Sequence, residues 1–229
     1  MSEPPPLRGL YPFLHGERRD TAAMREALLA SARQKAEDSA AVKQRFFAEH
    51  AGAVVDVADA IAGVYRRQGR MFSMGNGGSS CDASHFAVEF LHPVTTGRPA
   101  LAAVNLTADV AMLSAVGNDV GFEHVFLRQL MALARPGDGV IGFSTSGSSE
   151  NILAAFAKAK ALGMLTIALV GHDGGKMAAS AHADHCLVVP SGSIHRIQET
   201  HLVIYHILWD LVHALLAEDR GPLAGRLHP

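Results

Sequence analysis

The sequence is poor in cysteine and in charge, and it has no long apolar run. Its 2 cysteines, Cys81 and Cys186, are too few for a disulfide framework, so we expect reduced thiols in a cytoplasmic protein. Charged residues make up 18% of the chain and the net charge is −2, which gives no reason to expect nucleic acid or an anionic membrane as a partner. No apolar run approaches the roughly 20 residues of a membrane span, and the N-terminus lacks the pattern of a signal peptide.

What is present is a globular composition. The chain has 229 residues, of which 48% are hydrophobic, enough for one domain with a full core. Residues 1–20, proline-rich and then charged, are expected to form an N-terminal arm, and residues 21–229 a single domain. Apolar spacing over 21–49 and 50–67 predicts two helices ahead of a sheet.

From residue 70 onward, short apolar runs alternate with helical patterns. Such alternation predicts an α/β fold with right-handed crossovers and a doubly wound parallel sheet, whose ligands bind beyond the carboxyl ends of the strands. The expected strands are 71–74, 100–106, 139–144, 164–170 and 185–189. The expected helices are 81–91, 121–134, 150–162 and 196–217, with shorter pieces near 109–116 and 175–180.

The most informative segment is a hydroxyl-rich loop between a predicted strand and a predicted helix. It carries five hydroxyl groups in six residues: Ser144, Thr145, Ser146, Ser148 and Ser149. Helix N-termini favour phosphate because their N–H groups are unpaired and the helix dipole is positive there. The alternative is that Ser148 or Ser149 is simply a helix N-cap.

A second loop of this kind follows residues 71–74. It reads Gly75-Asn76-Gly77-Gly78-Ser79-Ser80 and precedes a helical run. Glycines let a ligand approach the backbone closely. No lysine follows them and the dinucleotide spacing is absent, so two polar loops of this type indicate a sugar phosphate rather than a nucleotide.

Candidate chemical groups lie on two predicted helices. His85 and Glu89 are four residues apart, one turn along one helix face, and could bind Zn²⁺ together or form an ordinary surface pair. Gln198 and His206, on the last helix, are eight apart, about 80° around it, which leaves open whether they converge or whether His206 is a buried histidine. Asn118-Asp119, expected in a loop, fits either an Asx turn or a pair that binds sugar hydroxyls.

Taken together, these motifs resemble the SIS (sugar isomerase) family and, more narrowly, the phosphoheptose isomerases. The resemblance covers about residues 45–217. The segments that carry it are Gly75–Ser79, Asp82–Glu89, Gly117–Phe122, Ser144–Gly147 with Ser149, Gly171–Met177, and Arg196–Glu199 with His206.

The resemblance implies a flavodoxin-like five-stranded sheet, a homotetramer, and conversion of sedoheptulose 7-phosphate to D-glycero-D-manno-heptose 7-phosphate for the synthesis of nucleotide-activated heptose and lipopolysaccharide precursors. It makes Glu89 and His206 the acid–base pair. The implied zinc ligands are His85, Glu89, Gln198 and His206. The implied substrate-binding residues are Asn76, Gly77, Gly78, Glu89, Asn118, Asp119, Ser144, Thr145, Ser146, Ser149 and Gln198.

Three departures from the family pattern concern the substrate more than the reaction. The chain begins with about 25 residues that the family usually lacks, residues 90–96 replace a basic and aromatic stretch, and His195 stands where an acid is common. The alternative to an enzyme is a non-catalytic SIS protein that binds a phosphosugar or a partner for regulation. Glu89 and His206 are both retained, which favours the enzyme.

Overall fold

The computed structural model describes residues 21–219, so the predicted arm of residues 1–20 lies outside the described residues. The chain divides into two units, with the boundary between Asp38 and Ser39. The described part of the first unit is the start of helix α2 (Thr21–Arg66), where most side chains are exposed. All other elements belong to the second unit.

The N-terminal region forms one helix rather than the two predicted, because no break occurs near residue 50. Gly52 lies inside α2 between two alanines. A glycine inside a helix costs only about 1 kcal/mol relative to alanine, and no proline stops the helix here. In the second unit, apolar side chains of α2 such as Phe46, Val57 and Ile61 are fully buried and offset that cost.

Five parallel strands form the sheet, in the order β2-β1-β3-β4-β5. They are β1 (Met71–Gly75), β2 (Ala103–Asn105), β3 (Gly139–Ser144), β4 (Leu165–Gly171) and β5 (His185–Val189). This is the flavodoxin-like order. The chain passes from β1 outward to β2, returns to place β3 on the other side of β1, and continues outward from there to β4 and β5. The predicted five-stranded, doubly wound fold is confirmed.

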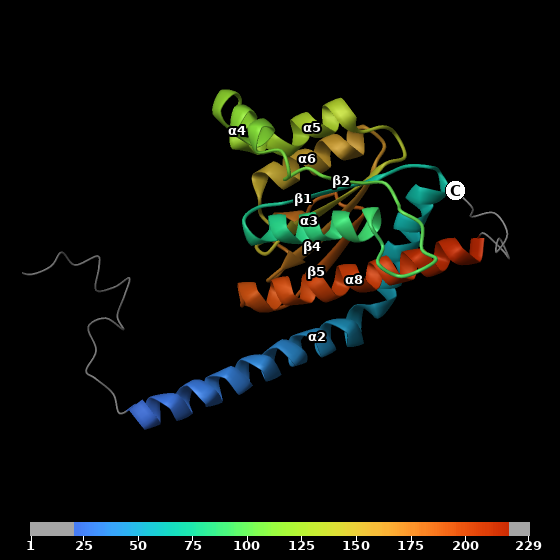
Figure 1. The fold of residues 1–229 in the computed structure, drawn as a ribbon. Coiled ribbons are helices and arrows are strands. Elements are labelled where there is room, and N and C mark those ends of the chain that lie inside the picture. Colours follow the sequence, from blue (N-terminus) through green and yellow to red (C-terminus); the bar gives the residue numbers. More distant parts are fainter. Residues whose placement is uncertain (1–20, 220–229) are drawn as a thin grey trace, which may run out of the picture. The chain divides into compact units, whose positions relative to one another are not determined.

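Helices cover both faces of this sheet (Figure 1). One face packs against α3 (Gly78–Leu91), α8 (Ile194–Asp219) and the α2 residues of the second unit. The other packs against α4 (Val110–Asp119), α5 (Val125–Leu133), α6 (Glu150–Ala161) and the short α7 (Gly175–Ala178), with a 3-10 turn, η2 (Phe122–His124), before α5.

The sheet has a hydrophobic core on each face, because side chains along each strand point alternately to the two faces. Ile141 and Phe143 of β3 point into the core under α3 and α8, whereas Val140 points into the core under α5 and α6. Successive side chains of a strand point to opposite faces, and both faces here are covered. The strands therefore read as continuous apolar runs, the pattern that predicted a parallel sheet.

Helix α8 is an exception to the expectation that no apolar run approaches the length of a membrane span. Within the described residues, Ile194–Ala217 is long and apolar enough to cross a membrane by length and composition, with a mean hydropathy of 1.3. However, 44% of the apolar 18-residue stretch within this helix is buried in the fold. Tyr205, Leu208 and Val212 are among its buried residues, so α8 serves as a core helix of this domain.

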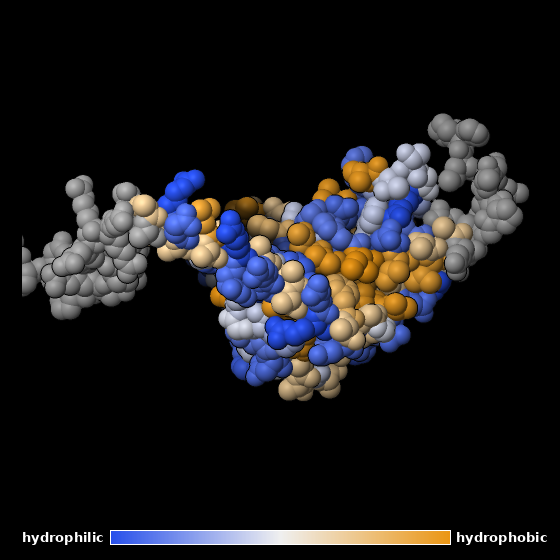
Figure 2. Space-filling view, turned by 90° about the horizontal axis from the view of Figure 1, so that it is seen from below, coloured by the Kyte–Doolittle hydropathy of each residue, from blue (hydrophilic) through white to orange (hydrophobic). Residues whose placement is uncertain are grey.

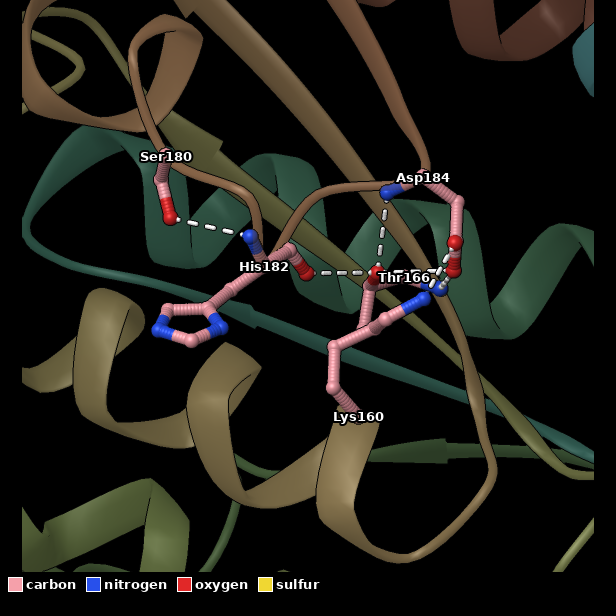
Figure 3. Close-up of polar contacts among 5 residues, drawn as sticks. All are labelled: Lys160, Thr166, Ser180, His182 and Asp184. Atoms are coloured by element: carbon pink, nitrogen blue, oxygen red, sulfur yellow. Dashed lines mark hydrogen bonds and ion pairs between the residues drawn. The ribbon is translucent and has the colours of Figure 1, made fainter.

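A polar cluster ties the starts of β4 and β5 to the end of α6 (Figure 3). The Asp184 carboxylate accepts hydrogen bonds from the backbone N–H and hydroxyl of Thr166, both at 2.9 Å, and from Lys160 at 2.5 Å. The Thr166 hydroxyl also lies 2.7 Å from the backbone oxygen of His182. Burial alone would raise the pKa of Asp184, but these hydrogen bonds hold the pKa below its ordinary value.

We predict that Asp184→Asn lowers the free energy of unfolding by about 1–2 kcal/mol at pH 7, because charge-assisted hydrogen bonds are lost. A carboxyl whose pKa is depressed in the folded state contributes stability above its unfolded pKa of about 3.9 and loses it as pH falls toward the folded value. The difference from wild type should therefore shrink below pH ~4. Urea denaturation at both pH values measures it, with exposed Asp59→Asn as the control; a pH-independent difference would contradict the assignment.

Candidate functional site: a His–Glu–His cluster between helices α3 and α8

The predicted catalytic residues come together where α3 and α8 lie side by side. The Oε1 atom of Glu89 is 2.9 Å from Nε2 of His85 and 4.0 Å from Nε2 of His206. The two imidazole rings are 4.9 Å apart at 85°. One ligand atom from each residue lies within 4.8 Å of the others, so His85, Glu89 and His206 form one cluster.

This cluster is half-open to solvent. The side chains of His85 and His206 are 39% and 43% exposed, and that of Glu89 is 21% exposed, so a small molecule can reach all three. Burial and the neighbouring His85 lower the pKa of His206, while Glu89 acts in the opposite direction. His206 is therefore neutral at pH 7, the form that can accept a proton or bind a metal.

Two contacts between the helices set their alignment. Trp209 on α8 donates its indole N–H to the backbone oxygen of Glu89 at 2.8 Å. About three turns earlier, Gln198 packs so closely on Gly78 that a Cβ atom at Gly78 would lie 2.3 Å from its amide nitrogen. The helices therefore run in the same direction, and a larger residue at position 78 would require the end of the Gln198 side chain to move. Gln198 of α8 contacts the first residue of α3 rather than the cluster, so its place among the metal ligands stays a prediction.

One carboxyl group near the cluster is buried. Asp82, one turn before His85, is 8% exposed, and its Oδ2 atom has no hydrogen-bond partner among the described residues. Burial raises the pKa of Asp82 to about 6, and His85 acts to lower it. The sequence did not predict that Asp82 is buried, because its burial depends on how α8 packs against α3.

The glycine loop leads directly into α3, which begins at Gly78 rather than at residue 81 as predicted. Asn76 and Asn151 form a reciprocal amide pair with two hydrogen bonds of 2.9 Å. Asn151 is 3% exposed on the first turn of α6, so this pair ties the loop after β1 to the loop after β3. The sequence analysis missed Asn151, since its partner is 75 residues away.

The hydroxyl loop after β3 is held in a tight turn. Gly147 has φ +63°, and a Cβ atom there would lie 2.1 Å from the backbone oxygen of Gly174, so the position requires glycine. Its N–H lies 3.1 Å from the Ser144 hydroxyl, which also contacts Ser149 Oγ at 3.0 Å. Among the described residues, none hydrogen-bonds the Thr145 hydroxyl, which remains available to a ligand.

Ser149 occupies the N-cap position of α6 but does not cap the helix with its side chain. Its hydroxyl is instead turned toward Ser144. The reading of Ser149 as a side-chain cap is therefore wrong, because the Ser144 hydroxyl competes for it. Whether the loop binds phosphate stays a prediction.

Asn118 and Asp119 form the last turn of α4 rather than a loop, which corrects their predicted location. Both are exposed, and the Asn118 amide donates to the Asp119 carboxylate at 2.8 Å. Nothing in this pairing excludes contact with a sugar. Their assignment to the substrate stays a prediction.

A cleft of about 600 Å³ opens beside the hydroxyl loop, beyond the carboxyl ends of β4 and β5. Its walls are Ser146, His172, Asp173, Pro190, Ser191 and Gly192. None of the three cluster residues lines it. We place the chemistry at the cluster, because within residues 21–219 only there do a carboxylate and two imidazoles face one another.

The fold and this cluster define a class of protein, and comparison with known proteins agrees. Residues 36–171 match the SIS domain family. Among solved structures, this chain is similar to a phosphoheptose isomerase from Neisseria gonorrhoeae, with a TM-score of 0.76 and 38% identity over 82% of this chain and 99% of that one. A phosphoheptose isomerase from Francisella tularensis gives a TM-score of 0.77 and 36% identity over 81% and 98%.

Relatives with curated names identify one enzyme family within the SIS domain class. A phosphoheptose isomerase of Aquifex aeolicus is 44% identical over 181 residues, 79% of this chain and 94% of the relative. One of Roseiflexus sp. (strain RS-1) is 42% identical over 183 residues, 80% and 92% of the two chains. The chain belongs to the phosphoheptose isomerase family and is an isomerase. The resemblance drawn from the sequence motifs is confirmed.

The loop geometry predicts separate effects for two hydroxyls. Thr145→Val should leave the melting temperature almost unchanged, because no described residue depends on that hydroxyl. It should weaken binding of a phosphorylated sugar roughly 10- to 100-fold, the value of a hydrogen bond to a charged group. Ser149→Ala should weaken binding and also cost about 1 kcal/mol of stability through the lost contact with Ser144.

Calorimetric titration with a ketose phosphate and with the same ketose lacking phosphate distinguishes the outcomes. Thr145→Val should narrow the difference between the two ligands. Equal weakening of both would show that the loop contacts the sugar body instead of the phosphate.

Proposed function

We propose that the protein interconverts sedoheptulose 7-phosphate and D-glycero-D-manno-heptose 7-phosphate. The observation that carries this proposal is the position of the Glu89 carboxylate, which faces the imidazoles of both His85 and His206 in an accessible site. Incubation of the purified protein with a panel of ketose phosphates, followed by detection of the aldose products, tests the substrate. The departures at His195 and at residues 90–96 make such a panel necessary.

The chemistry of a ketose–aldose exchange suits these groups. A proton leaves C1 and one arrives at C2, while another moves between the two oxygens, with an enediol as the intermediate. Glu89 is the base that moves the carbon-bound proton, and neutral His206 moves the proton between the oxygens. The two side chains are close enough to act on adjacent atoms of one substrate.

A zinc ion fits the donor set of the cluster. In a tetrahedral site with bonds of ~2.0–2.1 Å, ligand atoms lie roughly 3.4 Å apart, and the three atoms here, two nitrogens and one oxygen, lie within 4.8 Å of one another. His85, Glu89 and His206 would hold the metal, and Gln198 is the proposed fourth ligand. A bound Zn²⁺ would polarise the substrate carbonyl and stabilise negative charge on the enediolate.

Positioning of the substrate depends on the hydroxyl loop in this proposal. Phosphate held by Thr145, Ser146 and Ser149 fixes the far end of the sugar, so that C1 and C2 lie at the cluster. Orientation of this kind supplies several kcal/mol of the barrier. The Asn76–Asn151 pair supports it by joining the two loops at the β1/β3 switch point.

The alternative is a non-catalytic SIS protein that senses a phosphosugar or binds a partner. The fold alone does not decide, since the sugar isomerase domain of a transcription factor from Sphaerobacter thermophilus has a similar fold, with a TM-score of 0.57 and 18% identity. A sensor needs no acid–base pair, and here Glu89 and His206 face each other. A cytoplasmic location and a role in making nucleotide-activated heptose for lipopolysaccharide follow from the same proposal.

Replacement of the base tests the catalytic assignment. Glu89→Gln keeps the size and hydrogen bonding of the side chain but removes the carboxylate, so turnover should fall at least about a hundredfold. Glu49→Gln, an exposed position on α2, serves as the matched control and should retain wild-type turnover. Near-normal turnover of Glu89→Gln in a coupled aldose assay would remove Glu89 from the mechanism.

We also propose that the chain assembles as a homotetramer. Hydrophobic surface gathers on the face seen in Figure 2. The exposed apolar side chains of the α2, α3 and α8 layer are Val55, Val88, Leu91, Ile194 and Leu202. A second copy of this chain is the expected cover, since large exposed apolar patches are uncommon in monomers.

Light scattering should give four times the 24.2 kDa chain mass. Leu202→Asp should lower that mass, because a charge in an apolar contact is costly. Val110→Asp, an exposed apolar position on α4, is the control and should leave the mass unchanged. A wild-type mass of one chain would refute the tetramer.

A further inference from the structure

A buried tyrosine contacts the side of His85 that faces away from Glu89. The Tyr205 hydroxyl lies 2.8 Å from Nδ1 of His85, and the Tyr205 residue is 1% exposed. Nε2 of the same ring lies 2.9 Å from Glu89. Both nitrogens of His85 are thus engaged, one toward the open cluster and one toward the core.

The packing of α8 explains why Tyr205 reaches this place. Consecutive residues on a helix point about 100° apart, so Tyr205 and His206 present two different faces at the level of His85. Tyr205 points into the core, where its ring packs edge-on against Phe143 at 5.9 Å. His206 points to the partly exposed side, where it meets Glu89.

We propose that Tyr205 is a positioning residue that fixes the ring orientation of His85, so that Nε2 is presented for metal binding. This inference rests on the proposed zinc site. Tyr205 acts through His85, and its own hydroxyl is directed at Nδ1 rather than at the cluster. Its burial keeps water from taking its place.

A hydroxyl suits this role because it both donates and accepts. While Nε2 carries a proton toward the Glu89 carboxylate, Tyr205 donates to Nδ1. Once Nε2 loses that proton to bind a metal, Nδ1 carries the ring proton and donates to the Tyr205 oxygen. One side chain therefore satisfies Nδ1 of His85 in both states, without movement of the ring.

Loss of the hydroxyl removes the partner of Nδ1 of His85. Histidine ligands almost always donate their second nitrogen to a neighbouring group, and removal of that group typically lowers metal affinity 10- to 100-fold. Tyr205→Phe keeps the ring and its contact with Phe143, so the fold should survive. We expect its zinc dissociation constant to rise 10- to 100-fold.

The experiment compares the wild type, Tyr205→Phe and Tyr65→Phe. Tyr65 is the matched control, because its hydroxyl donates to the backbone oxygen of Ala102 at 3.3 Å, away from the cluster. Zinc affinity is measured by competition with a chromogenic chelator. The His85 ring nitrogens are followed by ¹⁵N NMR, with the His85→Asn spectrum for assignment, and melting temperatures verify folding.

In the wild type, zinc should move His85 from the Nε2–H to the Nδ1–H tautomer. Tyr205→Phe should show a shifted Nδ1 signal without zinc, because the hydrogen bond to that nitrogen is lost, and weakened zinc binding, whereas Tyr65→Phe should match the wild type. Unchanged affinity and ring signals in folded Tyr205→Phe would overturn the inference.

The metal-free NMR comparison keeps the inference separate from the zinc site. If the wild type binds no zinc, the proposed metal site fails, yet the Nδ1 signal of Tyr205→Phe still shows whether Tyr205 holds that nitrogen. If Tyr205→Phe does not fold, a wild-type Nδ1 signal typical of a hydrogen-bonded nitrogen supports the inference, and the signal of a free imidazole nitrogen contradicts it.

Discussion

The parallel packing of α3 against α8 on one face of the sheet is the constraint on which the site depends. His85 and Glu89 lie about 120 residues before His206 in the chain, and no local pattern joins them. The helices are aligned by contacts between them, above all the partly buried hydrogen bonds of the Trp209 N–H with the Glu89 backbone and of Tyr205 with His85. A shift of α8 by one turn, about 5.4 Å, would carry His206 away from Glu89.

The sheet adds a second constraint, because its strand order fixes where the two polar loops meet. With β1 beside β3, the glycine loop and the hydroxyl loop begin at neighbouring strand ends. The Asn76–Asn151 pair locks them together, and the tight turn at Gly147 holds the hydroxyl loop in shape. In the proposed mechanism, a sugar phosphate bound at this switch point extends from the hydroxyl loop toward the cluster.

Much of the fold was predictable from periodicity. The expected strand 139–144 matches β3, and 185–189 matches β5, since apolar runs bounded by glycine or polar residues leave little choice. The start of α3 was missed because Gly78 and Ser79 are poor helix formers that adopt the first turn only in their packed context. The helix break predicted near residue 50 was wrong, because burial of apolar side chains on one side of α2 stabilises the helix by more than Gly52 destabilises it.

The sequence predicted which residues belong to the candidate site, but not how they are arranged in space. Spacing placed His85 and Glu89 on one helix face, and the family resemblance added His206. The partners of Tyr205 and Asn76 lie 120 and 75 residues away, so only the tertiary structure brings them together. The contact of Gln198 with Gly78 likewise has no sequence signal, because it depends on the alignment of two helices.

The most direct test of the account is proton exchange at the substrate carbons. The purified protein is incubated with sedoheptulose 7-phosphate in D₂O, and the heptose 7-phosphates are followed by NMR. Because Glu89 is partly exposed to solvent, a proton held there exchanges, so deuterium should appear at C2 of the aldose and, on reversal, at C1 of the ketose. Aldose formed without deuterium, or no aldose at all, would contradict an acid–base site at Glu89 and His206.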